Sequence, residues 1–229
     1  MNIKQRLDAN LGAIILDVGD SLTGNENWHH SWRKAELLAA LYPTANVVFG
    51  DLDPYSFGSV NNITVRSGTG QQIKVVRDGK PGATTISRRA EVSQIYYYPF
   101  HHTNIFLGIN NVVNNGNPGY TVSGFMDDLA FLGCYARNNY GAGVTIIPPC
   151  WSQTGPSAIT SGYAANAIAT ARKNSFGYIE SHAMFQDHYS GSGQAGQGNW
   201  FPFPNGDVTH FGGEPHMNIA NMTMPTMGF

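Results

Sequence analysis

The sequence GAIILDVGDSLTG at residues 12–24 decides the fold. Its first half, at 14–18, is mostly aliphatic (Ile, Ile, Leu and Val) and is typical of a buried parallel strand. Gly19 allows a sharp turn where this strand ends, because glycine has no side chain. Ser21 then stands just beyond the carboxyl end of the strand, which is where open α/β sheets bind their ligands. The stretch therefore predicts an α/β fold with a serine at its ligand-binding edge.

A base for this serine is present near the other end of the chain, where Asp207 and His210 enclose a valine and a threonine. An acid three residues before a histidine can turn back to orient the imidazole and stabilise its charged form. Gly82 by its backbone N–H and Asn110 by its side-chain amide are suited to binding an oxyanion. The predicted catalytic residues are therefore Ser21, Asp207 and His210, with an oxyanion hole formed by Ser21, Gly82 and Asn110.

Four short blocks, at residues 19–22, 82, 108–110 and 207–210, resemble the four sequence blocks of the SGNH (GDSL) hydrolase superfamily, in the same order. A lone Gly-Asp-Ser-Leu is a weak signal, but four blocks in order on a matching strand and helix pattern are specific. One departure is Asn111, because the third block usually reads Gly-x-Asn-Asp. A second departure is the polar and aromatic run that follows the first block.

The resemblance implies a three-layer α/β/α, flavodoxin-like domain with about five parallel strands, and we expect a single domain over 1–229. It also implies a serine esterase that forms an acyl-enzyme on Ser21. The purely structural alternatives to these catalytic roles are a turn serine at 21, a helix-entry glycine at 82 and a surface turn at 207–210. Asn111 could replace Asn110 if the register is shifted by one. Asp20 is expected to tie down the turn, the alternative being that it orients the histidine.

Strand and helix patterns alternate along the rest of the chain, which predicts a doubly wound parallel sheet with helices on both faces. Strands are expected at 12–18, 46–49, 103–109, 144–147 and 176–179, and helices at 28–42, 84–97, 121–138 and 160–174. The runs 63–66 and 71–76 flank Ser-Gly-Thr-Gly and are expected to form a hairpin, with one of them also serving as a parallel strand that leads to Gly82.

Composition excludes several function classes. The chain has 229 residues, a formal net charge of −2 and only 12% charged residues, so no general attraction to nucleic acid or to an anionic membrane is expected. No apolar run is long enough to span a membrane. The first residues carry no signal-peptide pattern, which is compatible with a cytoplasmic protein or one carried on a viral particle.

Histidines offer the main rival chemistry, since the chain has eight of them. No H-E-x-x-H motif occurs, and adjacent histidines point to opposite faces of a strand, so neither a metal nor another cofactor is expected. Cys134 and Cys150 are too few for a disulfide framework and are expected to be free thiols.

Aromatic residues and uncharged polar residues are abundant in the predicted loops, and this combination suits the faces and hydroxyls of sugars. The resemblance adds that carbohydrate O-deacetylases are common in that superfamily, so we expect a substrate with short acyl esters, best matched by O-acetyl groups on a polysaccharide. The alternatives are a lipase or thioesterase of the same superfamily, or a catalytically idle glycan-binding or structural module. The glycine-rich composition with few charged residues is also compatible with assembly into a larger, phage-like complex.

Overall fold

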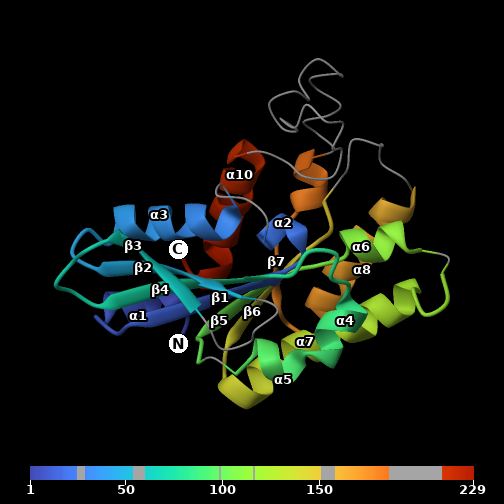
Figure 1. The fold of residues 1–229 in the computed structure, drawn as a ribbon, viewed down its shortest axis with the longest axis horizontal. Coiled ribbons are helices and arrows are strands. Elements are labelled where there is room, and N and C mark those ends of the chain that lie inside the picture. The colour runs from blue at the N-terminus through green and yellow to red at the C-terminus, as the bar shows by residue number, and fades with distance from the viewer. Residues whose placement is uncertain (25–28, 54–59, 98, 116, 151–157, 186–212) are drawn as a thin grey trace.

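The computed structural model describes residues 1–24, 29–53, 60–97, 99–115, 117–150, 158–185 and 213–229. Its centre is a seven-stranded sheet in the order β3-β2-β4-β1-β5-β6-β7, with helices on both faces (Figure 1). The strands are β1 (Ala13–Gly19), β2 (Asn46–Leu52), β3 (Val60–Arg66), β4 (Gln72–Gly79), β5 (His102–Phe106), β6 (Gly143–Ile147) and β7 (Gly177–Tyr178). All neighbouring strands are parallel except β2 and β3. The expected doubly wound α/β fold is confirmed, with seven strands rather than about five.

The expected hairpin is wrong, because β3 pairs with β2 and not with β4. The glycine-rich link between β3 and β4 passes over the start of β2 instead of turning back. The Gly70 N–H donates to the Thr44 carbonyl at 2.8 Å, and a Cβ on Gly68 would stand only 2.3 Å from the Ala45 oxygen. Glycine is required here for close backbone contact, which from sequence looks the same as a tight turn.

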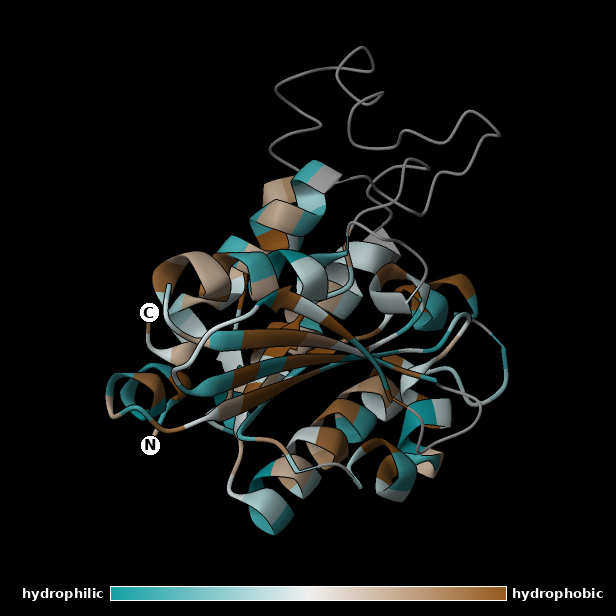
Figure 2. Cartoon of the chain, turned by 60° about the vertical axis from the view of Figure 1, so that its left-hand side comes forward, coloured by the Kyte–Doolittle hydropathy of each residue, from teal (hydrophilic) through white to brown (hydrophobic). Residues whose placement is uncertain are grey.

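In Figure 2 the hydrophobic residues gather on the central strands of the sheet, and helices lie over both of its faces. The helices are α1 (Ile3–Asp8), α2 (Ser21–Gly24), α3 (His30–Leu41), α4 (Thr85–Ala90), α5 (Val92–Ile95), α6 (Ile109–Val113), α7 (Val122–Tyr140), α8 (Ala158–Lys173) and α10 (Gly213–Thr223), followed by a short 3₁₀ turn, η2 (Pro225–Met227). Leu38 of α3 packs in one core cluster with Ile15 and Ile73. Leu132 of α7 packs in another with Val18 and residues of α8.

Figure 1 shows α3 and α10 on one side of the sheet and α4, α5 and α7 on the other. The expected helix at 84–97 is divided into α4 and α5, since Glu91 is the C-cap of the first and the N-cap of the second. Cys134 and Cys150 are free, as expected. Within the described part of the chain, none of the helices has the length and apolar character needed to cross a membrane.

Candidate active site

Ser21 is the first residue of α2 and lies directly beyond the carboxyl end of β1, at the edge where the sequence places it. The turn is held by close backbone contact. A Cβ on Gly19 would overlap the Thr23 side chain, and one on Gly24 would meet the Gly79 oxygen of β4 at 2.5 Å. These glycines press α2 onto the ends of β1 and β4, so the position of Ser21 is fixed by the sheet itself.

Asp20 ties down this turn, as the favoured interpretation of the sequence expects. The carboxylate is 1% exposed, and its Oδ1 accepts a hydrogen bond from the Leu22 N–H at 2.9 Å. The Asp20 backbone carbonyl accepts from the N–H groups of Thr23 and Gly24 at 3.1 and 3.0 Å. The acid therefore stabilises the first turn of α2 and with it the backbone that carries Ser21.

Asn110 connects the serine turn to the loop that contains Gly82. Its Nδ2 lies 3.0 Å from the Ala83 carbonyl and 3.4 Å from Asp20 Oδ2. Gly82 itself is exposed and adopts a φ of +73°, a conformation that favours glycine. One side chain thus brings together three segments that are far apart in the sequence, at the edge that holds Ser21.

The local structure around Asn110 differs from the expected strand over 103–109. The strand β5 ends at Phe106, and Gly108, with φ +130°, is the N-cap of the short helix α6. Asn110 therefore stands in the first turn of a helix and not at the end of a strand. A side chain at 108 would also crowd Phe125 and Pro149, so this glycine is needed for both its φ and its packing.

Asn111, the alternative donor that the sequence left open, has both ends of its side-chain amide bonded to Thr85. The side chain is 1% exposed, and its Oδ1 accepts from the Thr85 N–H at 3.1 Å while its Nδ2 donates to Thr85 Oγ1 at 3.0 Å. That hydroxyl in turn donates to Asp128 Oδ2 at 3.1 Å. An ionised acid at 111 could not supply the donor that Thr85 accepts, which gives a physical reason for asparagine here.

We expect the two neighbouring asparagines to separate function from stability. Asn110→Ala should lower kcat on a simple ester about 10²–10³-fold, the usual loss for one oxyanion-hole donor, and should lower the unfolding free energy by about 1 kcal/mol through loss of the hydrogen bond to Ala83. Asn111→Asp should instead destabilise the fold by about 1–3 kcal/mol, since it leaves a buried partner unsatisfied, and should largely retain kcat. Ester hydrolysis and urea unfolding of both variants check this. Equal loss of kcat in the two variants would contradict the placement of Asn110.

Asp207 and His210 lie outside the described residues, and their catalytic roles stay predictions. The helix that follows them, α10, packs against α3. At this contact the backbone N–H of His30 donates to His216 Nδ1 at 3.2 Å, and both histidines are buried. The chain that leaves the predicted acid–histidine segment is thus fixed to the start of the helix that follows Ser21.

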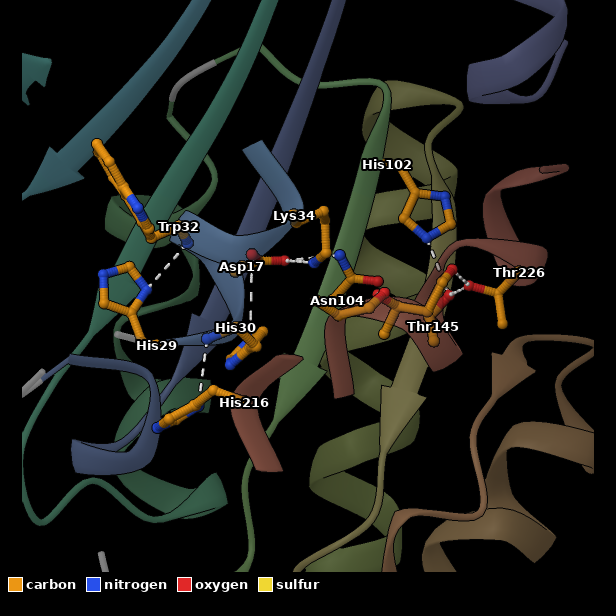
Figure 3. A network of polar contacts seen from close by, with 12 residues as sticks. Asp17, His29, His30, Trp32, Lys34, His102, Asn104, Thr145, His216 and Thr226 are labelled. Atoms are coloured by element: carbon orange, nitrogen blue, oxygen red, sulfur yellow. Dashed lines mark hydrogen bonds and ion pairs between the residues drawn. The ribbon is translucent and has the colours of Figure 1, made fainter. Parts of the chain in front are cut away.

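A row of polar side chains crosses the sheet two residues before the Gly19 turn, on the face covered by α3. Paired positions on successive strands, from β3 to β6, carry Asn61, Asp51, Arg77, Asp17, Asn104 and Thr145. At its centre, Asp17 Oδ1 accepts from Lys34 Nζ at 2.7 Å and from Asn104 Nδ2 at 2.6 Å (Figure 3). Sequence reasoning missed this row, although an aspartate inside an aliphatic strand was a signal for it.

The buried histidines beside this row are neutral. Burial, and next the Arg77 guanidinium, lowers the pKa of His29 to about 2. Burial, and next Lys34, lowers the pKa of His102 to about 3, and the same two causes hold the pKa of His30 well below its usual range. Among the described residues, no three His, Cys, Asp or Glu side chains are grouped so as to hold a metal ion. The histidines of this face therefore act as neutral packing and hydrogen-bonding groups.

These histidines predict a loss of stability in mild acid. Their folded-state pKa values lie below that of an exposed histidine, near 6.5, so the unfolded chain binds protons that the folded chain does not. Stability should be full above that value and fall as the pH drops. Between pH 7 and pH 5, His29 and His102 should each remove about 2 kcal/mol. Urea unfolding at both pH values measures the loss, and His102→Gln should make it smaller by about 2 kcal/mol. An unfolding free energy that stays constant from pH 7 to pH 5 would contradict the prediction.

The fold was compared with known sequences and structures. Neither a protein-family model nor a curated protein sequence matches the chain. The acetylxylan esterase Axe2 from Geobacillus stearothermophilus superposes with a TM-score of 0.69 at 16% identity, over 95% of this chain and 94% of that one. The chain shares the fold of an acetylxylan esterase. LAE5, an alpha/beta hydrolase from the metagenome of Lake Arreo in Spain, matches with a TM-score of 0.68 at 14% identity, over 94% of this chain and 95% of that one.

These matches confirm the α/β fold that the resemblance in sequence implies. Three of the matching structures are catalytic mutants of Axe2, in which a serine, an aspartate or a histidine is replaced by alanine. In that enzyme the replaced aspartate stands three residues before the replaced histidine.

Proposed function

We propose that this protein is a carboxylic ester hydrolase that uses Ser21 as its nucleophile and removes O-acetyl groups from a polysaccharide. The observation that carries the proposal is the contact of Asn110 Nδ2 with both Asp20 and Ala83, which gathers Ser21, Asn110 and the Gly82 loop at one edge of the sheet. A nucleophile next to oxyanion donors from separate elements is the arrangement that acyl transfer needs.

In the proposed reaction, His210 removes the Ser21 hydroxyl proton as Oγ attacks the ester carbonyl, and Asp207 orients the imidazole. The negative oxygen of the tetrahedral intermediate accepts hydrogen bonds from the Ser21 and Gly82 N–H groups and from the Asn110 amide. The 3.4 Å contact of this amide with Asp20 is longer than an ordinary hydrogen bond, so one of its N–H groups is held weakly and is suited to the oxyanion. His210 then gives its proton to the departing sugar oxygen, and water releases acetate from Ser21 by the same steps.

The choice of an acetylated polysaccharide is supported by the fold shared with an acetylxylan esterase. The predicted acid and base are supported by the catalytic mutants of that enzyme, because Asp207 and His210 have the same spacing as the aspartate and histidine replaced there. An idle glycan-binding module is disfavoured, since a decayed enzyme would more often have lost one of the polar groups.

A chain-length series tests the proposal. Wild-type protein is assayed on p-nitrophenyl acetate, butyrate and octanoate, and on acetylated xylan with release of acetate as the readout. We expect turnover to be highest on the acetyl esters. A preference for octanoate would favour a lipase, and no turnover together with no labelling by a serine-reactive phosphonate would favour the binding module.

A further inference from the structure

We propose that a cavity on the face of the sheet covered by α3 is a subsite for a neutral sugar of the same glycan chain, beside the acetylated sugar. This inference deepens the proposed function and rests on it. The cavity has a volume of about 400 Å³, and its lining comes from the start of α3 and from β2, β3 and β4. The lining residues are His29, Trp32, Phe49, Asp51, Asn61, Ile63 and Arg77.

The cavity lies two strands away from β1, the strand that ends at the Ser21 turn. Arg77 on β4 is paired with Asp17 on β1, two residues before the Gly19 turn, and Asp51 is paired with Arg77 on the next strand. Neighbouring strands lie about 4.8 Å apart, so Asp51 lies about 10 Å across the sheet from β1. A sugar in the cavity and an acetylated sugar at Ser21 can therefore belong to one glycan chain.

Trp32 provides a rigid aromatic surface in this cavity. Its Nε1 donates to Glu36 Oε1 at 2.9 Å, and its ring meets Phe49 edge-on with centroids 5.5 Å apart. The indole is half-buried and is thus held in one orientation before any ligand arrives. A large ring that is fixed in advance loses little entropy on binding, and one apolar face suits the C–H face of a pyranose.

The polar groups of the cavity are arranged for hydroxyls rather than for an ion. Arg77 makes a two-pronged ion pair with Asp51, at 2.8 and 2.5 Å, so the two charges compensate each other. The Asp51 side chain remains 37% exposed, and Asn61 lies opposite it on β3. Vicinal sugar hydroxyls both donate and accept, and a carboxylate, a guanidinium and an amide side by side meet both needs.

His29 adds a neutral donor to this set. Its Nδ1 accepts from the Trp32 N–H at 3.3 Å (Figure 3), so the proton of the neutral ring is on Nε2. A phosphate or a uronate would find no uncompensated positive charge among these groups, and an acyl chain would have to desolvate the ion pair. The lining therefore favours an uncharged sugar over these other ligands.

The test compares a polymeric substrate with one too short to reach the cavity. Acetylated xylooligosaccharides and p-nitrophenyl acetate are assayed with wild type, Trp32→Ala, Asn61→Ala and Trp32→Phe. The ratio of kcat/KM on the oligosaccharide to kcat/KM on p-nitrophenyl acetate should fall at least tenfold in Trp32→Ala, mainly through KM, and Trp32→Phe should restore much of it. Asn61 is exposed on the edge strand, so Asn61→Ala tests the same cavity without disturbing the core.

Phe131→Ala serves as the matched control, because Phe131 is a partly exposed aromatic residue on α7, beyond the opposite face of the sheet. It should leave the ratio unchanged. Two outcomes would overturn the subsite while supporting the esterase, and in both p-nitrophenyl acetate is hydrolysed in a Ser21-dependent way. In the first, the ratio of the two kcat/KM values does not fall in Trp32→Ala. In the second, the oligosaccharide is not hydrolysed at all. Absence of Ser21-dependent hydrolysis of both substrates would remove the proposed function and the subsite together.

Discussion

Ser21→Ala is expected to lower kcat on p-nitrophenyl acetate by a factor of about 10⁶, the loss measured for the serine of another hydrolase whose triad acts as a unit. Alanine keeps the Cβ and removes only the hydroxyl, so the turn between β1 and α2 should persist. The unfolding free energy should change by about 1 kcal/mol, the net contribution of one hydrogen bond. Steady-state kinetics and urea unfolding measure the two effects.

The control for this substitution is Ser123→Ala, which removes an exposed hydroxyl at the start of α7. It should leave kcat within twofold of wild type. A Ser21→Ala variant that retains more than about a hundredth of wild-type turnover would show that another group attacks the ester, since loss of the nucleophile of a triad costs far more than that. Parallel loss in His210→Ala would support the predicted base.

The positions of Ser21 and Asn110 at one edge of the sheet could be predicted from the sequence by one simple rule. The carboxyl ends of parallel strands meet at one edge of a sheet, so a serine after β1 and an asparagine after β5 had to lie close together. The short motifs at 19–22 and 108–110 specify local turns, and the parallel sheet brings these turns to the same edge. The structure adds that Asn110 makes the contact from a helix.

The features that were missed depend on partners distant in the sequence. Ser-Gly-Thr-Gly predicts a tight turn between β3 and β4. In the fold, β2 lies between these two strands and pairs with both, and the local sequence around the turn contains no information about β2. Asp17 similarly finds Asn104 and Lys34 only after β5 and α3 have packed on β1. The helical spacing of Trp32 is typical of a core residue, and only the fold shows that it also lines a cavity.

Lys34→Met is expected to destabilise the protein by about 3–5 kcal/mol, the cost of removing one partner of a buried ion pair. Lys34 and Asp17 are both 0% exposed, and without the ammonium the Asp17 carboxylate keeps only the Asn104 amide as a hydrogen-bond donor among the described residues. Burial lowers the pKa of Lys34 while Asp17 opposes that shift, so each charge depends on the other. Urea unfolding at pH 7 measures the loss.

Two comparisons separate this effect from the loss of a lysine as such. Lys4→Met removes a similar ion pair, to Asp8, whose side chains are 44% and 50% exposed, and should cost at most about 1 kcal/mol. The double variant Lys34→Met with Asp17→Asn should recover much of the stability, because no charge then remains buried and the oxygen of the introduced amide can still accept from Asn104. A double variant as unstable as Lys34→Met alone would show that the lysine acts through packing. Recovery would instead show that the charge pair does little for net stability where α3 packs on β1, the strand that leads to Ser21.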